Sequence, residues 1–521
     1  MPCPTCFLNA SSTWLRVDGM GFSIFDILIV VIYLLLSSAL GAWIGRHQKS
    51  TTDYFLGGKQ IPLPAVTFSI VATETSVLTF ISIPAVSYQG NLTFIQITIG
   101  YLVGRLLVAA IMIPAYYRGA LTTAYHYLGQ RFGQKMRNIA SLTFMATRLL
   151  ADGVRLFATA IPLAIIIKGS GVVAGLSDSQ FYACSIIFIG LLTIVYTYVG
   201  GIRSVIWMDV VQMSIYITGA ILAAVIILKD LPGATASIWN APDIMSKMQW
   251  FDLGGNLSIT QFIQQPYTFF TAVFAGAIFS LASHGTDQLI VQRVLTCKDR
   301  KSSQLAMATS GIAVLLQFLL FLVLGILLFA YYGGLPYDQL GLSRADGIFP
   351  KFIVEEMPSG ISGLIVAALF AAAMSTLSSS LSSLSSAAVL DIYLPLFGQD
   401  KSEGQLLRIS RLATLAWGVA LTGTALAFIG LQGTVVEVAL GIASYTYGGL
   451  LGVFLLGLFS KTTDQRDGII GFFTALVIMA VVIRTTQIAW PLYTVVGSLM
   501  AVATGMFSSR IFGPTSAAVS N

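Results

Sequence analysis

Long apolar stretches, separated by short polar connections, follow one another along almost the whole chain. Most are close to the roughly 20 residues that a helix needs to cross a bilayer. Thirteen such stretches can be recognised, at residues 22–44, 64–86, 94–116, 139–167, 181–199, 205–228, 269–282, 305–331, 361–390, 412–429, 435–459, 468–483 and 488–506. The seventh is short but continues through His284 and Asp287 to Val291, which indicates a polar break inside a span. The pattern predicts an all-α, polytopic membrane protein with about 13 transmembrane helices.

The composition excludes a soluble protein. Of the 521 residues, 56% are hydrophobic and 10% are charged, and so few charges cannot cover the surface of a soluble chain of this length. Four cysteines and three histidines form no recognisable metal-binding or catalytic motif. We find no nucleophile and base at a spacing that catalysis would use, so we do not expect an enzyme.

Basic residues in the connections predict the orientation in the membrane. With the N-terminus outside, eighteen of the 28 Lys and Arg residues fall in the inner connections and seven in the outer ones. Because Lys and Arg are enriched on the cytoplasmic side, we expect an integral protein of a bacterial inner membrane with its C-terminus in the cytoplasm. Residues 1–21 would form an extracytoplasmic extension, unless Met20 is the natural start. The net charge of +6 belongs to the inner connections, so we expect no nucleic-acid partner.

Hydroxyl groups are concentrated in the span at 361–390. Nine Ser or Thr residues lie between Ser375 and Ser386. Ala372, Ser375, Thr376 and Ser379 are spaced i, i+3, i+4 and i+7, so they share one face of a helix. Oxygen atoms are the ligands that a hard cation such as sodium prefers. This face could therefore bind a cation, or it could be a stripe of small residues that allows close helix packing.

A polar run also interrupts the middle of the second span. Residues 73–76 read Thr-Glu-Thr-Ser, and Thr79 follows one turn later. Such a run predicts a helix that breaks near the bilayer centre, where free carbonyls can bind an ion and half-helix ends can bind a substrate. The alternative is a continuous helix whose hydroxyls bond back to their own backbone.

Charged residues inside apolar spans are costly unless they pair or face water. Arg148, Asp152 and Arg155 are spaced i, i+4 and i+7, so the carboxylate can bridge both guanidinium groups on one helical face. Glu74 needs Arg105, Arg155, a cationic group on a substrate or hydroxyl donors to neutralise it. We expect an internal ion pair with one of the two arginines.

Five motifs, taken together, resemble the sodium:solute symporter family. They are the runs 53–58 (DYFLGG), 123–132 (TAYHYLGQRF), 196–212 (YTYVGGIRSVIWMDVVQ), 287–293 (DQLIVQR) and the serine-rich helix. The resemblance extends from about Phe22 to Met506. It implies a transporter core at 61–460 with a broken helix at the midplane, made of two inverted five-helix repeats at about 61–229 and 267–460. One peripheral helix (22–45) would precede the core, and two (466–511) and a short cytoplasmic tail (512–521) would follow it.

The resemblance also implies sodium sites, with Na+ as the coupling ion. In this family the main site lies between the broken helix and the serine-rich helix. Its implied ligands here are Ala72 and Thr75 through their carbonyls, with Ala372, Ser375 and Thr376. A second site, found in some members, would use Asp209, Ser375, Ser378 and Ser379.

Family substrates lie at the bilayer midplane against the broken helix and the third, fourth and seventh spans. The residues implied here are Glu74, Ser76, Thr79, Phe94, Gln96, Thr98 and Arg155. The carboxylate-binding arginine of the sialic acid transporters falls on Ala151 when aligned without gaps, and Glu74 replaces a hydroxyl residue. Both departures argue against sialic acid as the substrate.

The resemblance implies a sodium-coupled symporter that imports a small polar organic solute by alternating access. We favour a sugar or sugar acid as the solute, with an amino acid or a monocarboxylate as the alternative. A membrane sensor built on the same fold is an alternative of another class, although the segment after Met506 is too short for a kinase domain. The expected partners are the solute, sodium and the lipid bilayer.

Overall fold

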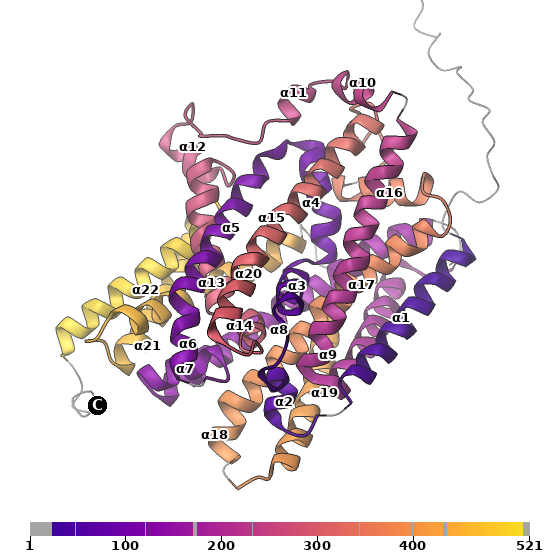
Figure 1. The fold of residues 1–521 in the computed structure, drawn as a ribbon. Helices are drawn as coiled ribbons and strands as arrows, with labels where there is room; N and C mark the ends of the chain where they lie inside the picture. Colours follow the sequence, from indigo (N-terminus) through magenta and orange to yellow (C-terminus); the bar gives the residue numbers. More distant parts are fainter. Residues whose placement is uncertain are drawn as a thin grey trace, which may run out of the picture.

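The computed structural model describes residues 23–46, 48–119, 121–169, 175–231, 233–342, 344–398, 400–430 and 435–513. All of its regular structure in these ranges is helical (Figure 1). The predictions for residues 1–21, including a start at Met20, and for 514–521 lie outside the described residues.

The α-helices follow the predicted spans and the connections between them. They are α1 (Ile24–Ile44), α2 (Thr51–Leu56), α3 (Leu63–Glu74), α4 (Val77–Gln89), α5 (Ile95–Leu107), α6 (Ile113–Arg118), α7 (Ala124–Phe132), α8 (Gln134–Gly169), α9 (Asp178–Asp230), α10 (Ala234–Trp239), α11 (Ile244–Lys247), α12 (Ile259–Gln264), α13 (Gly276–Gly285), α14 (Gln288–Val294), α15 (Arg300–Tyr331), α16 (Ile348–Glu355), α17 (Ile361–Ser386), α18 (Leu394–Phe397), α19 (Glu403–Ala427), α20 (Val435–Phe459), α21 (Gln465–Thr485) and α22 (Pro491–Phe512). Wider helical turns extend α5 (η3, Val108–Met112), precede α13 (η4, Phe270–Ala275) and extend α17 (η6, Ala387–Tyr393). Tighter single turns lie at η1 (Gly57–Lys59), η2 (Leu92–Phe94) and η5 (Ala345–Gly347).

The helices confirm an all-α polytopic membrane protein. Within the described ranges, nine helical stretches are long and apolar enough to cross a membrane, and a tenth span consists of α3 and α4. Two of the predicted spans, the fifth and sixth, lie in the single 53-residue helix α9, which is interrupted at Gly201 with a φ of 54°. The number thirteen therefore stays a prediction.

The second predicted span is broken, as the polar run indicated. Helix α3 ends at Glu74, α4 begins at Val77, and the two axes differ by 66°. Thr75 has an extended backbone, and its hydroxyl bonds back to the carbonyl oxygen of Val71 at 2.8 Å. The backbone N–H of Ser76, which would continue the helix, faces the hydroxyl of Thr79 at 3.4 Å instead. The carbonyl of Ala72 is thereby released from the helix and can accept other donors.

The seventh predicted span is broken too, which confirms the expected polar break. Helix α13 ends at Gly285, and Asp287 caps the N-terminus of α14 by accepting a hydrogen bond from the N–H of Leu289 at 2.9 Å. A carboxylate at this position satisfies a free N–H and is favoured by the helix dipole.

Helix α17 lies at the centre of the molecule. It packs on α1, α8, α9 and α19, and it also contacts both halves of the broken span, α3 and α4. Asp26 of α1 fixes the N-terminus of α17, because one of its oxygens accepts hydrogen bonds from the N–H groups of Gly360 and Gly363, each at 2.7 Å. Helix α17, which carries the serine-rich face, is therefore fixed at its first turn by Asp26 of α1.

Short helices in the connections lie at two opposite ends of the molecule. In Figure 1, α10, α11 and α12 lie at one end, whereas α2, α7 and α18 lie at the other. The C-terminal helices α20, α21 and α22 pack on one another beside α8 and α13.

Candidate functional site

A small cavity lies where the break between α3 and α4 faces α17. Its volume is about 10 Å³, which is about the space that one water-sized sphere needs. Its lining is Ala72, Thr75, Gln212, Met213, Tyr216, Ala372 and Ser375. Four of the five residues predicted for the main sodium site therefore meet around one cavity, and we call it the first cavity.

Hydroxyl and carbonyl oxygens supply the polar atoms of the first cavity. Ser375 donates to Asp209 Oδ1 at 2.6 Å and approaches the released carbonyl of Ala72 at 3.3 Å. The hydroxyl of Thr75 accepts a hydrogen bond from Nε2 of Gln317 at 2.7 Å. Serine oxygens and carbonyls at one spot are the donor set that a hard cation needs.

Gln212 adds an unexpected polar group to this wall. Its side chain is 1% exposed, and neither of its amide atoms makes a hydrogen bond within the described residues. The hydroxyls of Tyr33 and Tyr196 are among its polar neighbours. The two tyrosine hydroxyls therefore face this buried amide, and because Gln212 lines the first cavity it can also contact an ion or its water there.

The fifth predicted ligand, Thr376, faces a second cavity. Its hydroxyl bonds back to the carbonyl of Ala372 at 3.1 Å, so this oxygen is partly committed to its own helix. The second cavity also measures about 10 Å³ and is lined by Ser76, Asp152, Arg155, Leu156, Thr159, Ala373, Thr376 and Leu377. Two of the predicted substrate residues, Ser76 and Arg155, lie together here. Neighbouring positions 375 and 376 thus serve two adjoining cavities.

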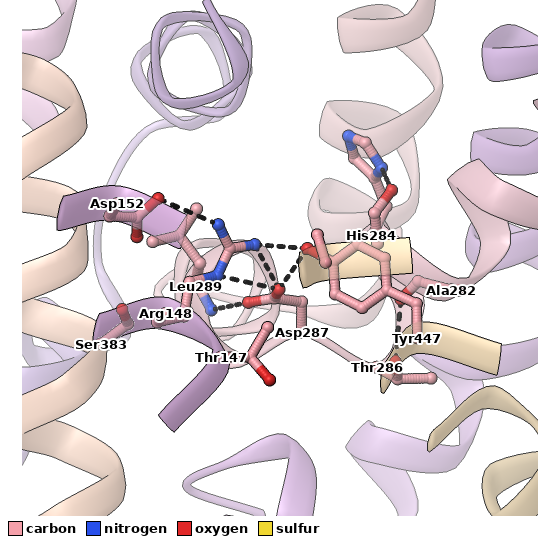
Figure 2. A network of polar contacts seen from close by, with 12 residues as sticks. Thr147, Arg148, Asp152, Ala282, His284, Thr286, Asp287, Leu289, Ser383 and Tyr447 are labelled. Carbon is pink, nitrogen blue, oxygen red and sulfur yellow. Dashed lines mark hydrogen bonds and ion pairs between the residues drawn. The ribbon is translucent and has the colours of Figure 1, made fainter. Parts of the chain in front are cut away.

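Asp152 links the second cavity to the break between α13 and α14. Its Oδ1 accepts from Arg148 at 3.4 Å and from Arg155 at 3.5 Å, which confirms the predicted bridge, and its Oδ2 accepts from Ser380 at 2.5 Å. Figure 2 shows Arg148 between Asp152 and Asp287; it contacts both carboxylates, and its ion pair with Asp287 is buried. Tyr447 of α20 donates to the same carboxylate at 2.8 Å.

The four residues predicted for the second sodium site lie on α9 and α17, with an arginine beside them. Oδ2 of Asp209 accepts from Arg293 of α14 at 3.2 Å and from Ser69 at 2.5 Å. Arg293 also donates to Ser379, whereas Ser378 bonds back to the carbonyl of Ser375 at 3.1 Å. The buried aspartate therefore already has a cationic partner.

Glu74 pairs with Arg105 of α5, which settles the choice between the two arginines. Arg105 is fully buried, and it also donates to Ser310 at 2.9 Å. Nε2 of His284, beside the second helix break, lies 3.5 Å from Oε2 of Glu74. Glu74 lines neither cavity. It faces Arg105 of α5, whereas Arg155 of α8 lines the second cavity.

The other predicted substrate residues do not line the second cavity either. Thr79 faces the N–H of Ser76, and Thr98 bonds back to the carbonyl of Ile95 at 2.8 Å. Phe94 stacks on Phe318 with ring centroids 5.5 Å apart.

The remaining predicted substrate residue, Gln96, holds the connection before α13. Its Nε2 donates to the carbonyl of Tyr267 at 2.7 Å, and its Oε1 accepts from the N–H of Asp252 at 3.3 Å.

Sequence reasoning missed the polar side chains that come from other helices. They are Gln212, Tyr216, Arg293 and Gln317. Gln212 and Arg293 are the last residues of two of the family motifs, 196–212 and 287–293, and Gln317 stands alone in an apolar stretch; these were the signals that could have singled them out.

Comparisons with known proteins agree with this architecture. The sodium:solute symporter family model matches residues 54–475. The chain is 29% identical over 512 residues to the sodium/sialic acid symporter SiaT of Proteus mirabilis, covering 95% of this chain and 96% of that protein. It is also 29% identical over 507 residues to the sodium/sialic acid symporter NanT of Aliivibrio fischeri, covering 95% of each.

A solved structure of another protein also matches this chain. It is described as the substrate-bound outward-open state of a Na+-coupled sialic acid symporter with a novel Na+ site. The two chains are 28% identical and superpose with a TM-score of 0.80, covering 95% of this chain and 99% of the other. The chain therefore belongs to the sodium:solute symporter family, and its coupling ion is Na+.

Proposed function

We propose that the protein imports an acidic sugar together with sodium. The observation that carries this proposal is the pair of adjoining cavities on α17, one lined by carbonyl and hydroxyl oxygens and the other by Arg155. Sodium would bind in the first cavity and the solute in the second. The two ligands would contact successive residues of one helix, Ser375 and Thr376.

Sodium binding in the first cavity would join two separate structural elements. The carbonyl of Ala72 belongs to α3, whereas the hydroxyl of Ser375 belongs to α17. An ion held between them favours the conformation in which the broken helix rests on α17, because a ligand shifts the population toward the state that it binds better. The same conformation brings Ser76, at the break before α4, and Thr376 of α17 to the second cavity. Sodium and solute would thus favour one another's binding.

The second cavity supports an acidic, hydroxyl-rich solute. The side chain of Arg155 is 21% exposed, and its contact with Asp152 is long, at 3.5 Å. Its planar guanidinium group therefore remains available to bind a carboxylate. Ser76 and Thr376 add hydroxyl groups beside it. The relatives named above transport sialic acid, which is a sugar acid. Arg155 lies one turn after Ala151 and can supply the cation that is absent at that position.

We infer the topology from the positive-inside rule and the family fold. The end of the molecule with α2, α7 and α18 would face the cytoplasm, and the inverted repeats would span 61–229 and 267–460. The peripheral segments 22–45 and 466–511 would flank this core.

Replacing Ser375 by Ala is expected to raise the sodium concentration for half-maximal uptake by about tenfold, because it removes one oxygen from the first cavity. Thr376→Ala should raise it less, because Thr376 faces the second cavity. Radiolabelled solute uptake into proteoliposomes, measured against sodium concentration, checks both. Ser385→Ala is the control, because within the described residues that hydroxyl bonds back to the carbonyl of Leu381 at 2.6 Å and lines neither cavity. Sodium-independent uptake by the parent protein would refute the proposed coupling.

A second sodium ion at Asp209, Ser375, Ser378 and Ser379 remains part of the proposal. Its support is the full set of oxygen-bearing side chains, together with the novel Na+ site named for the related solved structure. If this site works, the parent protein shows a sodium Hill coefficient above one, and Asp209→Asn lowers it toward one. A parent coefficient near one would mean that Arg293 is the only cation at this aspartate.

A further inference from the structure

Gln317 is the polar residue of an otherwise apolar stretch of α15, 311–330, and it lies behind the wall of the first cavity. The residue is 3% exposed and does not line the cavity itself. Its Nε2 donates to two residues that do, to the hydroxyl of Thr75 at 2.7 Å and to the hydroxyl of Tyr216 at 3.2 Å. One side chain of α15 therefore connects the end of α3 with α9.

The hydroxyl of Thr75 determines which amide atom of Gln317 must face it. This hydroxyl donates its single hydrogen to the carbonyl of Val71 at 2.8 Å. Toward Gln317 it can therefore only accept, and only the amide nitrogen can donate. The nitrogen carries two hydrogens, so it can serve Thr75 and Tyr216 at the same time. An apolar residue in this position could make neither bond.

Helix packing alone does not explain an amide at this position. Oε1 of Gln317 is buried and has no donor among the described residues, and such an acceptor is costly. An apolar side chain of similar length would avoid that cost. The ring of Tyr216 is held independently, because it packs on Phe80 of α4 and Phe321 of α15 with centroids 5.1 and 5.2 Å away. The contact that distinguishes Gln317 is thus the one with Thr75.

Thr75 lies where α3 ends and the first cavity begins. Its N–H still bonds to the carbonyl of Val71 at 3.0 Å, but its ψ of 113° turns the chain out of the helix. The carbonyls of Ala72 and Thr75 are the implied sodium ligands on this side. Ligands that are fixed before the ion arrives bind it more tightly, because less freedom is lost on binding. A bond from α15, which packs on both α3 and α4, can fix them.

We propose that Gln317 is a positioning residue of the first sodium site. It holds Thr75 against α15, so that the carbonyls at the end of α3 stay in place for the ion. Gln317 lines neither cavity, so it acts through Thr75 and not by contact with the ion or the solute. This inference rests on sodium binding in the first cavity, as proposed above.

Sodium binding in the absence of solute tests this role. The purified protein is titrated with NaCl, with choline chloride keeping the ionic strength constant, and the sodium concentration for half of the thermal stabilisation is measured. Gln317→Met keeps the length of the side chain but removes the donor. It should raise this concentration roughly two- to tenfold, the effect of losing one net hydrogen bond.

A second glutamine of α15 provides the matched control. Nε2 of Gln304 donates to the carbonyl of Ala109 at 2.6 Å, and Gln304 lines neither cavity. Gln304→Met should therefore bind sodium like the parent. At saturating sodium, Gln317→Met should also keep the parent KM for the solute, because only the sodium site is disturbed. A general loss of structure would change both values.

Thr75→Val removes the same bond from the other side. It keeps the backbone carbonyl and the branched shape of the side chain, but it also removes the bond to Val71, so it should raise the sodium concentration at least as much as Gln317→Met. The double variant should then bind sodium like Thr75→Val alone, because no further bond is lost. If Gln317→Met does not fold, Thr75→Val decides the question in its place.

Parent-like sodium binding by Gln317→Met or by Thr75→Val would overturn the proposal. So would effects of the two single variants that multiply in the double variant. Ser375→Ala separates these results from a failure of the site itself. If Ser375→Ala also binds sodium like the parent, the first cavity is not the sodium site and both proposals fail. If Ser375→Ala weakens binding and Gln317→Met does not, the site stands and the positioning role of Gln317 is refuted.

Discussion

Glu74→Gln is expected to abolish solute uptake and to lower the stability of the protein. The substitution leaves Arg105, which is fully buried, without its negative partner. Breaking a buried ion pair from one side costs about 3–5 kcal/mol, because a charge remains in a medium of low dielectric constant. Sodium should still stabilise the variant, because Glu74 does not line the first cavity. Uptake assays and thermal unfolding with and without sodium measure the two effects separately.

A double variant distinguishes an ion-pair role from a substrate contact. Arg105→Gln alone should be as damaging as Glu74→Gln, whereas the two substitutions together should be less destabilising than either one, because no unpaired charge remains. Recovery of uptake in the double variant would show that Glu74 acts through Arg105. Persistent loss of uptake with recovered stability would show that Glu74 contacts the solute.

A surface ion pair provides the control for these variants. Glu355 pairs with Lys351 at 2.5 Å, and its side chain is 45% exposed. Because exposed pairs contribute little to stability, Glu355→Gln should unfold and transport like the parent. Parent-like uptake by Glu74→Gln would show that the buried pair is dispensable for transport.

Local patterns in the sequence predicted the features that depend on neighbouring residues. The polar run at 73–76 predicted the break between α3 and α4, because hydroxyls that bond back to nearby carbonyls compete with the helix. The i, i+4, i+7 spacing predicted that Asp152 bridges Arg148 and Arg155, because all three lie on one face of α8.

Contacts between distant helices could not be derived in this way. Glu74 had two possible partners on other spans, and nothing in the spacing favoured Arg105 over Arg155. The hydroxyl-rich face of α17 indicated either ion ligands or a stripe for close helix packing, and neither interpretation predicted that Ser382 and Ser386 accept hydrogen bonds from glutamines about a hundred residues earlier. Helical periodicity shows which residues share a face, and only the packing shows what that face meets.

Packing also divided the predicted sites. Ser375 and Thr376 are adjacent in sequence, and a rotation of about 100° per residue turns them toward different cavities. The predicted substrate set was divided similarly, because Ser76 and Arg155 line the second cavity whereas Phe94 and Gln96 pack elsewhere.

Arg155→Gln is expected to reduce the uptake of an acidic sugar at least about 30-fold. Truncating one partner of a buried charge pair costs about 2–5 kcal/mol, because the solute carboxylate would enter the second cavity without a cation. Arg155→Lys should be impaired less, because it keeps the charge but loses the planar fork that binds both carboxylate oxygens. Arg484→Gln, at an exposed position near the end of α21, serves as the control for removing a positive charge.

The charge of the solute decides whether Arg155 acts as proposed. Uptake of sialic acid and of its neutral amide should be compared in the parent protein and in Arg155→Gln. The parent should prefer the acid, and the variant should lose most of this preference, because Asp152 would then leave the second cavity with a net negative charge. Equal loss of acid and amide would indicate that Arg155 only supports the helix. A parent that transports neither compound, but takes up an amino acid or a monocarboxylate with sodium, would keep the first cavity as the sodium site and change the solute assigned to the second.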